Sequence, residues 1–250
     1  MARKTSFEAG IAKVKSVHPE SAGDIDRVLE SGVSSCDDLI AAMDSMGAEE
    51  RSTAAWLMGR LGTKRHARGL LKYLQSDDRA LGTAAATSIS VIGGKAVVRP
   101  LLDIMRKGAR ADYREAAGYA LSFLMAYGYS RPVLEAYLDV LNDENEAPAV
   151  RAQVCEGLNY IDWGDRRRRL ARRVIASLLR ALGDASPEVR FWACFAIGKY
   201  GVRRALPALK ALAEKDKILV PGWWTVGEEA ADAITTINGG FPPDRVMRRE

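Results

Sequence analysis

Residues 51–62 read RSTAAWLMGRLG, and residues 190–201 read RFWACFAIGKYG. Both stretches begin with arginine, place two small residues three and four positions later, and place glycine eight and eleven positions later. Weaker copies of this template begin at Gly82, Arg114, Arg151 and Gly227, so that successive copies start 31 to 39 residues apart. Self-similarity at such a period is typical of proteins built from repeated supersecondary units.

A second apolar run follows each of the first five copies. After the copy at Arg151, for example, Leu170, Val174, Leu178 and Leu182 recur at the spacing of one helical face. Each unit is therefore predicted to be a pair of helices, and because no segment alternates with a period of two, the fold class is predicted to be all-α.

Proline and glycine set the expected helix boundaries. Pro148 and Pro187 are expected in the first turn of their helices, where proline fits best, and Ser186 is expected as a capping hydroxyl. Glycines are expected to end first helices in the left-handed conformation that glycine adopts most readily. These glycines are Gly62, Gly93 and Gly201.

On these residues the chain resembles HEAT repeats of the short, phycobilisome-lyase type, over roughly residues 49–239. We expect an α-solenoid, a right-handed superhelix of about six helical hairpins, with the second helices lining the concave side. The prediction is a single domain over residues 1–250. Residues 1–48 form an atypical capping unit, residues 49–239 the repeats, and residues 240–250 a flexible tail.

Composition restricts the class of protein. The chain contains 48% hydrophobic and 28% charged residues, which is the balance of an ordinary globular protein. It has no run of about 20 apolar residues that could span a membrane, and no apolar run follows its start as in a secretory signal. We therefore expect a cytoplasmic protein without membrane contact.

The sequence offers little to build a catalytic or metal site. The three cysteines Cys36, Cys155 and Cys194 lack metal-type spacing, and Cys155 and Cys194 both fall at a small, buried template position. The two histidines cannot form a histidine-rich zinc site, and His66 is expected on the surface. No metal and no cofactor are predicted.

Four template copies begin with an arginine, at Arg51, Arg114, Arg151 and Arg190. In repeats of this kind such an arginine usually pairs with an acidic residue of the adjacent turn. Asp143, Asp184 and Glu188 are near enough in sequence to serve. These arginines are therefore predicted to be structural and not a binding row.

Basic residues recur near the starts of the second helices, where cations oppose the helix dipole. Six arginines occur within residues 165–173, and Arg169, Arg172, Arg173 and Arg180 share the side opposite the apolar stripe. Trp163 adds a possible stacking surface. The row is either a binding ridge or a solvated, arginine-rich face, and Glu135 and Asp139 interrupt it. The candidate partner-binding residues are Lys64, Arg65, Arg68, Lys95, Arg99, Arg131, Trp163, Arg168, Arg169, Arg172, Arg173, Arg180, Arg203 and Arg204.

The connection before the last template copy contains Trp223 and Trp224. Bulky apolar residues there either contact a partner or fold back over the last unit, and the second role is favoured. Trp224 and Glu228 also resemble the aromatic and carboxylate residues of HEAT-like alkyl-purine glycosylases. They depart from that pattern in position and in residue type, so no catalytic role is transferred to them.

The predicted function is a non-catalytic protein–protein interaction scaffold or regulator that binds an acidic protein partner along a basic concave ridge. One alternative is a nucleic-acid-binding protein, conceivably with glycosylase-like chemistry. Another is a pigment-lyase-like enzyme, suggested only by the resemblance. The oligomeric state is left open.

Overall fold

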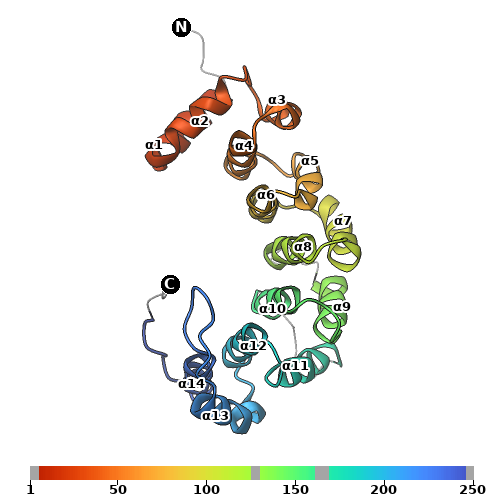
Figure 1. The fold of residues 1–250 in the computed structure, drawn as a ribbon, viewed down its shortest axis with the longest axis vertical. Helices are drawn as coiled ribbons and strands as arrows, with labels where there is room; N and C mark the ends of the chain where they lie inside the picture. Colours follow the sequence, from red (N-terminus) through yellow and green to blue (C-terminus); the bar gives the residue numbers. More distant parts are fainter. Residues whose placement is uncertain (1–5, 125–129, 161–168, 246–250) are drawn as a thin grey trace. The chain divides into compact units, whose positions relative to one another are not determined.

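The computed structural model describes residues 6–124, 130–160 and 169–245. The chain divides into two compact units, residues 1–124 and 125–250, each of them a stack of helices (Figure 1). None of the described helices is long and apolar enough to cross a membrane. An isolated bridge joins Leu219 and Thr225, and the described residues form no β-strand. The predicted all-α class is confirmed.

The first unit contains α1 (Ser6–Val17), η1 (Pro19–Ser21), α2 (Ala22–Leu29), α3 (Cys36–Ala42), η2 (Met43–Ser45), α4 (Ala48–Leu61), α5 (Ala67–Leu70), η3 (Leu71–Gln75), α6 (Arg79–Ile92), α7 (Lys95–Lys107) and α8 (Ala111–Leu124). The second unit contains α9 (Ser130–Leu141), α10 (Pro148–Gly157), α11 (Arg169–Ala181), α12 (Pro187–Lys199), η5 (Arg203–Ala205), α13 (Leu206–Lys215) and α14 (Val226–Ile237). The six template copies fall on α4, α6, α8, α10, α12 and α14, which confirms the predicted repeat. The division of the chain into one solenoid domain with a cap and a flexible tail stays a prediction.

The predicted helix boundaries are mostly confirmed. Pro148 and Pro187 begin α10 and α12, although the Ser186 side chain forms no capping hydrogen bond. Gly93 and Gly201 have φ of 59° and 60°, as expected. For Gly62 the expected left-handed conformation is wrong, because its φ is −72°. Glycine is required there for another reason: a Cβ would collide with the carbonyl oxygen of Met58.

Small residues let neighbouring first helices approach closely. A Cβ added to Gly59 in α4 would lie 2.7 Å from Ser88 Oγ of α6, and Ser88 Oγ donates a hydrogen bond of 2.6 Å to the carbonyl of Ala55. In the second unit, a Cβ on Gly198 in α12 would lie 2.8 Å from Ala233 Cα of α14. Glycine and alanine therefore set the spacing between first helices in both units.

Within the second unit, α10, α12 and α14 form the inner row of a bend, and α9, α11 and α13 form the outer row (Figure 1). The prediction that second helices line the concave side is wrong for this unit. The reason is the close approach of the first helices. Gly198 of α12 meets Ala233 of α14, and the first helices pack on one another more extensively than the second helices do, so they form the inner side of the bend.

Candidate partner-binding surfaces

Three of the predicted ridge residues, Arg169, Arg172 and Arg173, lie on one side of α11, which we call the arginine face of α11. Val174 and Leu178 are fully buried, so the helix presents Arg169, Arg172 and Arg173 to solvent, as their spacing predicts. Among the described residues, none forms an ion pair or a side-chain hydrogen bond with these three guanidinium groups. Their positive charges therefore lie close together on one helix without a described counter-charge.

The remaining ridge residues of the second unit differ from this face. Arg131 on α9 pairs with Glu135 at 3.1 Å, and Arg180 donates hydrogen bonds to Asn142 Oδ1 (2.6 Å) and Ser177 Oγ (3.1 Å). Arg203 and Arg204 are exposed in η5. Trp163 and Arg168 lie outside the described residues.

The first unit carries the other predicted basic residues. Arg65 lies in the turn before α5 and pairs with Asp37 of α3 at 2.7 Å. Lys64, Arg68, Lys95 and Arg99 are exposed, in the same turn, on α5 and on α7. The predicted ridge is thus divided between the two units, and the arginine face of α11 is a cluster without a counter-charge among the described residues.

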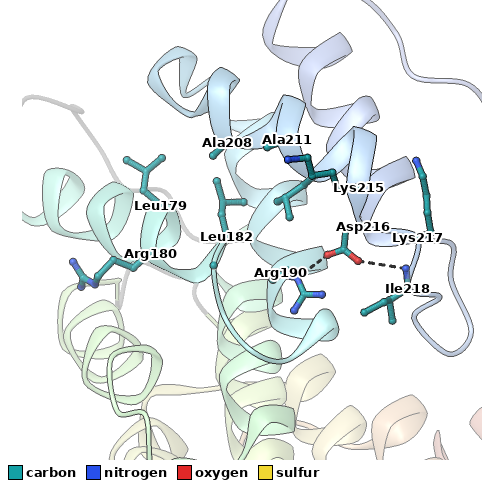
Figure 2. A pocket seen from close by; sticks show the side chains of 12 residues that line it. Leu179, Arg180, Leu182, Arg190, Ala208, Ala211, Lys215, Asp216, Lys217 and Ile218 are labelled. Carbon is teal, nitrogen blue, oxygen red and sulfur yellow. Dashed lines mark hydrogen bonds and ion pairs between the residues drawn. The ribbon is translucent and has the colours of Figure 1, made fainter.

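A groove of about 710 Å³ lies between the C-terminal part of α11, from Leu179 on, and α13 (Figure 2). Its basic lining residues are Arg180, Lys215 and Lys217, together with Arg190. Its apolar lining residues are Leu179, Leu182, Ala208, Ala211, Leu212 and Ile218. The sequence does not reveal this groove, because the apolar period shows which residues face inward but not how far apart two helices lie.

Two template arginines form buried ion pairs with an aspartate in the turn that follows the next helix of the chain. Arg190 Nε contacts Asp216 Oδ2 at 2.7 Å beside the groove, and the Arg151 side chain contacts Asp184 at 2.9 Å. Arg51 and Arg114 donate hydrogen bonds to backbone carbonyls of the turn that precedes their helices. The predicted pairing with an acidic residue is confirmed for Arg151 with Asp184, and Arg190 pairs with Asp216, which was not among the predicted partners.

Two further predictions concern potentially reactive groups. Cys155 and Cys194 are fully buried as predicted, and this burial raises the pKa of both thiols well above the ordinary value. The predicted surface position of His66 is wrong, because the residue is 5% exposed. Its Nδ1 accepts a hydrogen bond of 2.9 Å from the Thr63 backbone N–H, which holds the ring against the turn.

Trp223 and Trp224 fold back onto α12, which confirms the favoured prediction. Their ring centroids lie 5.1 Å from Trp192 and 5.7 Å from Phe191, respectively. Glu228, the carboxylate of the glycosylase-like pattern, instead caps α14. Its Oε2 accepts a hydrogen bond of 2.9 Å from the Thr225 backbone N–H, and Thr225 Oγ1 accepts one of 3.2 Å from the Glu228 N–H.

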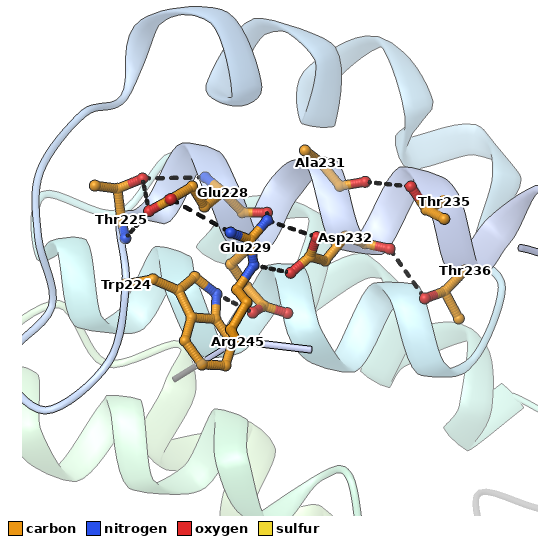
Figure 3. A network of polar contacts seen from close by, with 9 residues as sticks. All are labelled: Trp224, Thr225, Glu228, Glu229, Ala231, Asp232, Thr235, Thr236 and Arg245. Atoms are coloured by element: carbon orange, nitrogen blue, oxygen red, sulfur yellow. Dashed lines mark hydrogen bonds and ion pairs between the residues drawn. The ribbon is translucent and has the colours of Figure 1, made fainter. Parts of the chain in front are cut away.

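The structure also contains a polar network on α14 that the repeat pattern of the sequence does not predict. Arg245, from the predicted flexible tail, returns to this helix and contacts Glu228 and Asp232, while Trp224 donates a hydrogen bond to Glu229 (Figure 3). The pKa of Glu229 is raised to about 7, chiefly by burial; the negative charge of Asp232 also raises it, while the hydrogen bond from Trp224 and the charge of Arg245 lower it. The sequence holds one weak signal for this network, the group of three carboxylates within the first two turns of α14.

Comparisons with known proteins place the repeat in a family. The model of HEAT repeats matches residues 36–122 and 133–220, which together are more than half of the chain. No curated protein matched. A computationally designed armadillo repeat protein for modular peptide recognition is similar in structure, with 18% sequence identity and a TM-score of 0.47. That match covers 80% of this chain and 98% of the designed one. From the extent of the family match, the chain belongs to the HEAT-repeat family.

Proposed function

We propose that this HEAT-repeat protein is a non-catalytic scaffold or regulator that binds an acidic segment of a partner protein. The binding surface is the arginine face of α11 together with the groove between α11 and α13. The observation that carries the proposal is the set of three exposed guanidinium groups, Arg169, Arg172 and Arg173, without a described counter-charge. HEAT-repeat folds serve widely as surfaces for binding other macromolecules.

The energetics of the face support an anionic partner. Like charges at helical spacings of three and four residues repel each other, so the arrangement of Arg169, Arg172 and Arg173 does not stabilise α11 by itself. A carboxylate would relieve that repulsion. The planar fork of each guanidinium can also bind a carboxylate through two parallel hydrogen bonds.

The groove supports a protein partner over a nucleic acid. Arg172 lies seven residues before Leu179 on α11, which is two helical turns along the same face. A bound segment can therefore place acidic side chains on the arginines and apolar side chains over Leu179 and Leu182 in the groove. A nucleic acid would satisfy the arginines but has no aliphatic side chain for the groove.

The test replaces Arg169, Arg172 and Arg173 with glutamine and compares capture of partners from nuclease-treated native lysate. We expect capture to fall by about tenfold or more, which corresponds to about 1.4 kcal/mol of binding free energy. Melting should hardly change, because exposed like charges contribute little to folding. The matched control replaces Lys13, Lys107 and Lys210, three exposed lysines on other surfaces, so that net charge falls equally.

Capture that is unchanged in the triple arginine variant would contradict the proposal. If nuclease treatment abolishes capture, the surface binds a nucleic acid and not an acidic protein segment. In that case each lost phosphate contact should reduce the slope of log affinity against log salt by nearly one unit. The phycobilisome-lyase subtype, the contribution of the first unit's basic residues and the cytoplasmic location stay predictions.

A further inference from the structure

In the described part of the C-terminal tail, the half-buried Arg245 side chain contacts α14. Arg245 binds Asp232 with both ends of its fork: Nη2 donates to Oδ1 at 2.8 Å, and Nε donates to Oδ2. Nη1 and Nη2 also reach Glu228, at its Oε1 (3.3 Å) and its backbone carbonyl (3.4 Å). The guanidinium carbon lies 5.7 Å from the ring centroid of Trp224 (Figure 3).

We propose that Trp224, Glu228, Glu229 and Asp232 form a binding site for an arginine side chain in an extended segment of a partner protein. We call these four residues the α14 arginine site. In the unbound protein the chain's own Arg245 occupies the site, and the partner's arginine displaces it.

The geometry of the α14 arginine site selects arginine over lysine. Arg245 makes four donor contacts, two of them in the parallel arrangement that only a planar guanidinium offers to a carboxylate. A cation near the face of Trp224 gains further attraction from the ring. The compact ammonium group of lysine has three donors on one atom and cannot contact Asp232 through two nitrogens.

Charge and burial also indicate a site for a ligand. The carboxylates of Glu228 and Asp232 both contact the one guanidinium, and the almost fully buried Glu229 lies beside them, so acidic groups outnumber the cation at the site. Burial is the main cause that raises the pKa of Glu229; the negative charge of Asp232 adds to it and the charge of Arg245 lowers it. A cationic side chain is therefore the chemistry that the α14 arginine site favours.

The tail is attached in a way that permits exchange. Residues 238–244 are all exposed, and Phe241 is 95% exposed. Gly240 N–H donates to the Thr235 carbonyl at 3.0 Å, and the next tail side chain with a described contact is Arg245. The tethered Arg245 competes with an arginine from another protein. Its effective concentration at the site is in the millimolar range, as for other short flexible connections, so a ligand can displace it.

The inference goes beyond the proposed function. The α14 arginine site lies on an inner-row helix and attracts cations, whereas the arginine face of α11 lies on an outer-row helix and attracts anions. Either surface can fail its test while the other passes.

The experiment measures binding of a peptide to the full chain with Arg245→Ala, which empties the site without changing its walls. The peptide is Gly-Phe-Pro-Pro-Asp-Arg with an amidated end, copied from residues 240–245. The readout is the indole N–H resonance of Trp224, assigned with Trp224→Phe. We expect this resonance to shift and saturate with the arginine peptide, and not with a peptide carrying glutamine in place of the arginine.

Competition by the chain's own tail supplies the second expectation. The unaltered chain should bind the peptide on the order of tenfold more weakly than Arg245→Ala, because its own arginine occupies the site. Lys210→Ala, which removes another cation from the same unit, should behave like the unaltered chain. Asp232→Asn combined with Arg245→Ala should abolish binding, and Glu228→Gln combined with Arg245→Ala, which should weaken it, is the second site variant if that chain does not fold.

Three results would overturn the inference. One is equal binding of the arginine and glutamine peptides to Arg245→Ala. Another is equal affinity of Arg245→Ala and the unaltered chain for the arginine peptide. The third is a dimer of the unaltered chain in sedimentation that Arg245→Ala abolishes, because that would assign the site to the tail of a second copy.

Discussion

Replacing Gly198 with alanine should destabilise the second unit. Gly198 lies in α12 where that helix crosses α14, and a Cβ there would lie 2.8 Å from Ala233 Cα and 2.9 Å from Ala233 Cβ. Carbon atoms in good contact are about 3.5–4.0 Å apart, so the added methyl group is roughly 1 Å too close. Because one of the obstructing atoms belongs to the backbone, α12 and α14 must move apart.

The expected cost follows from two opposing effects. Forcing an extra carbon into a packed core costs about 1–3 kcal/mol, and replacing glycine with alanine inside a helix returns up to about 1 kcal/mol. The net loss in free energy of unfolding should therefore be about 1–2 kcal/mol. Gly82→Ala is the matched control, because the nearest atoms to its Cβ are carbonyl oxygens at 3.8 Å. That variant should be unchanged or stabilised by up to about 1 kcal/mol.

Urea unfolding followed by tryptophan fluorescence provides the assay. Four of the five tryptophans lie in the second unit, at residues 163, 192, 223 and 224, so the signal reports mainly on that unit. Far-ultraviolet circular dichroism follows both units. If Gly198→Ala were as stable as the unaltered chain, contact between the backbones of first helices would not limit their spacing, and the account of the inner row would fail.

Three further predictions follow from buried groups. Arg190→Met should lower the free energy of unfolding by about 3–5 kcal/mol in the same assay, because it leaves the buried Asp216 carboxylate without its partner; unchanged stability would show that the pair is dispensable. The folded-state pKa of Glu229, about 7, is above its unfolded value, so the native state binds the proton more tightly and stability falls as pH rises from about 4.5 to about 7. Glu229→Gln should therefore match the unaltered chain at pH 5 and be more stable at pH 8, by roughly 3 kcal/mol at most, and equal melting temperatures at pH 8 would refute the assignment. Cys155 and Cys194 should react with a thiol reagent only at the rate of unfolding, and rapid labelling of either in the native protein would contradict their burial.

The helices and their register could be predicted because burial leaves a period in the sequence. The small pair at Ala54 and Ala55 and the glycine at Gly59 mark the side of α4 that meets its neighbour, and they recur in α12. Which row lies inside the bend could not be predicted from that period. The row whose neighbouring helices lie closer together forms the inside of the bend. The distance between two helices depends on both of them, so the pattern within one helix does not predict it.

The candidate surfaces could be predicted only in part. The arginine face of α11 follows from the helical spacing of Arg172 and Arg173 around buried Val174. The α14 arginine site could not be predicted, because it requires Arg245 to return across a tail with no apolar period. The place of His66 at the start of a second helix predicts a surface residue, whereas the side chain is buried and its Nδ1 accepts a hydrogen bond from the Thr63 N–H of the same turn.

Cross-linking from the arginine face tests the central claim most directly. A photoreactive residue at Ala176, between Arg172 and Arg173 on one side and Leu179 on the other, would capture whatever binds there in cells. The account predicts cross-links to a protein segment rich in aspartate and glutamate, which resist nuclease and are lost when Arg169, Arg172 and Arg173 become glutamine. Cross-links to nucleic acid alone, or cross-links to protein that persist unchanged in the glutamine variant, would contradict it.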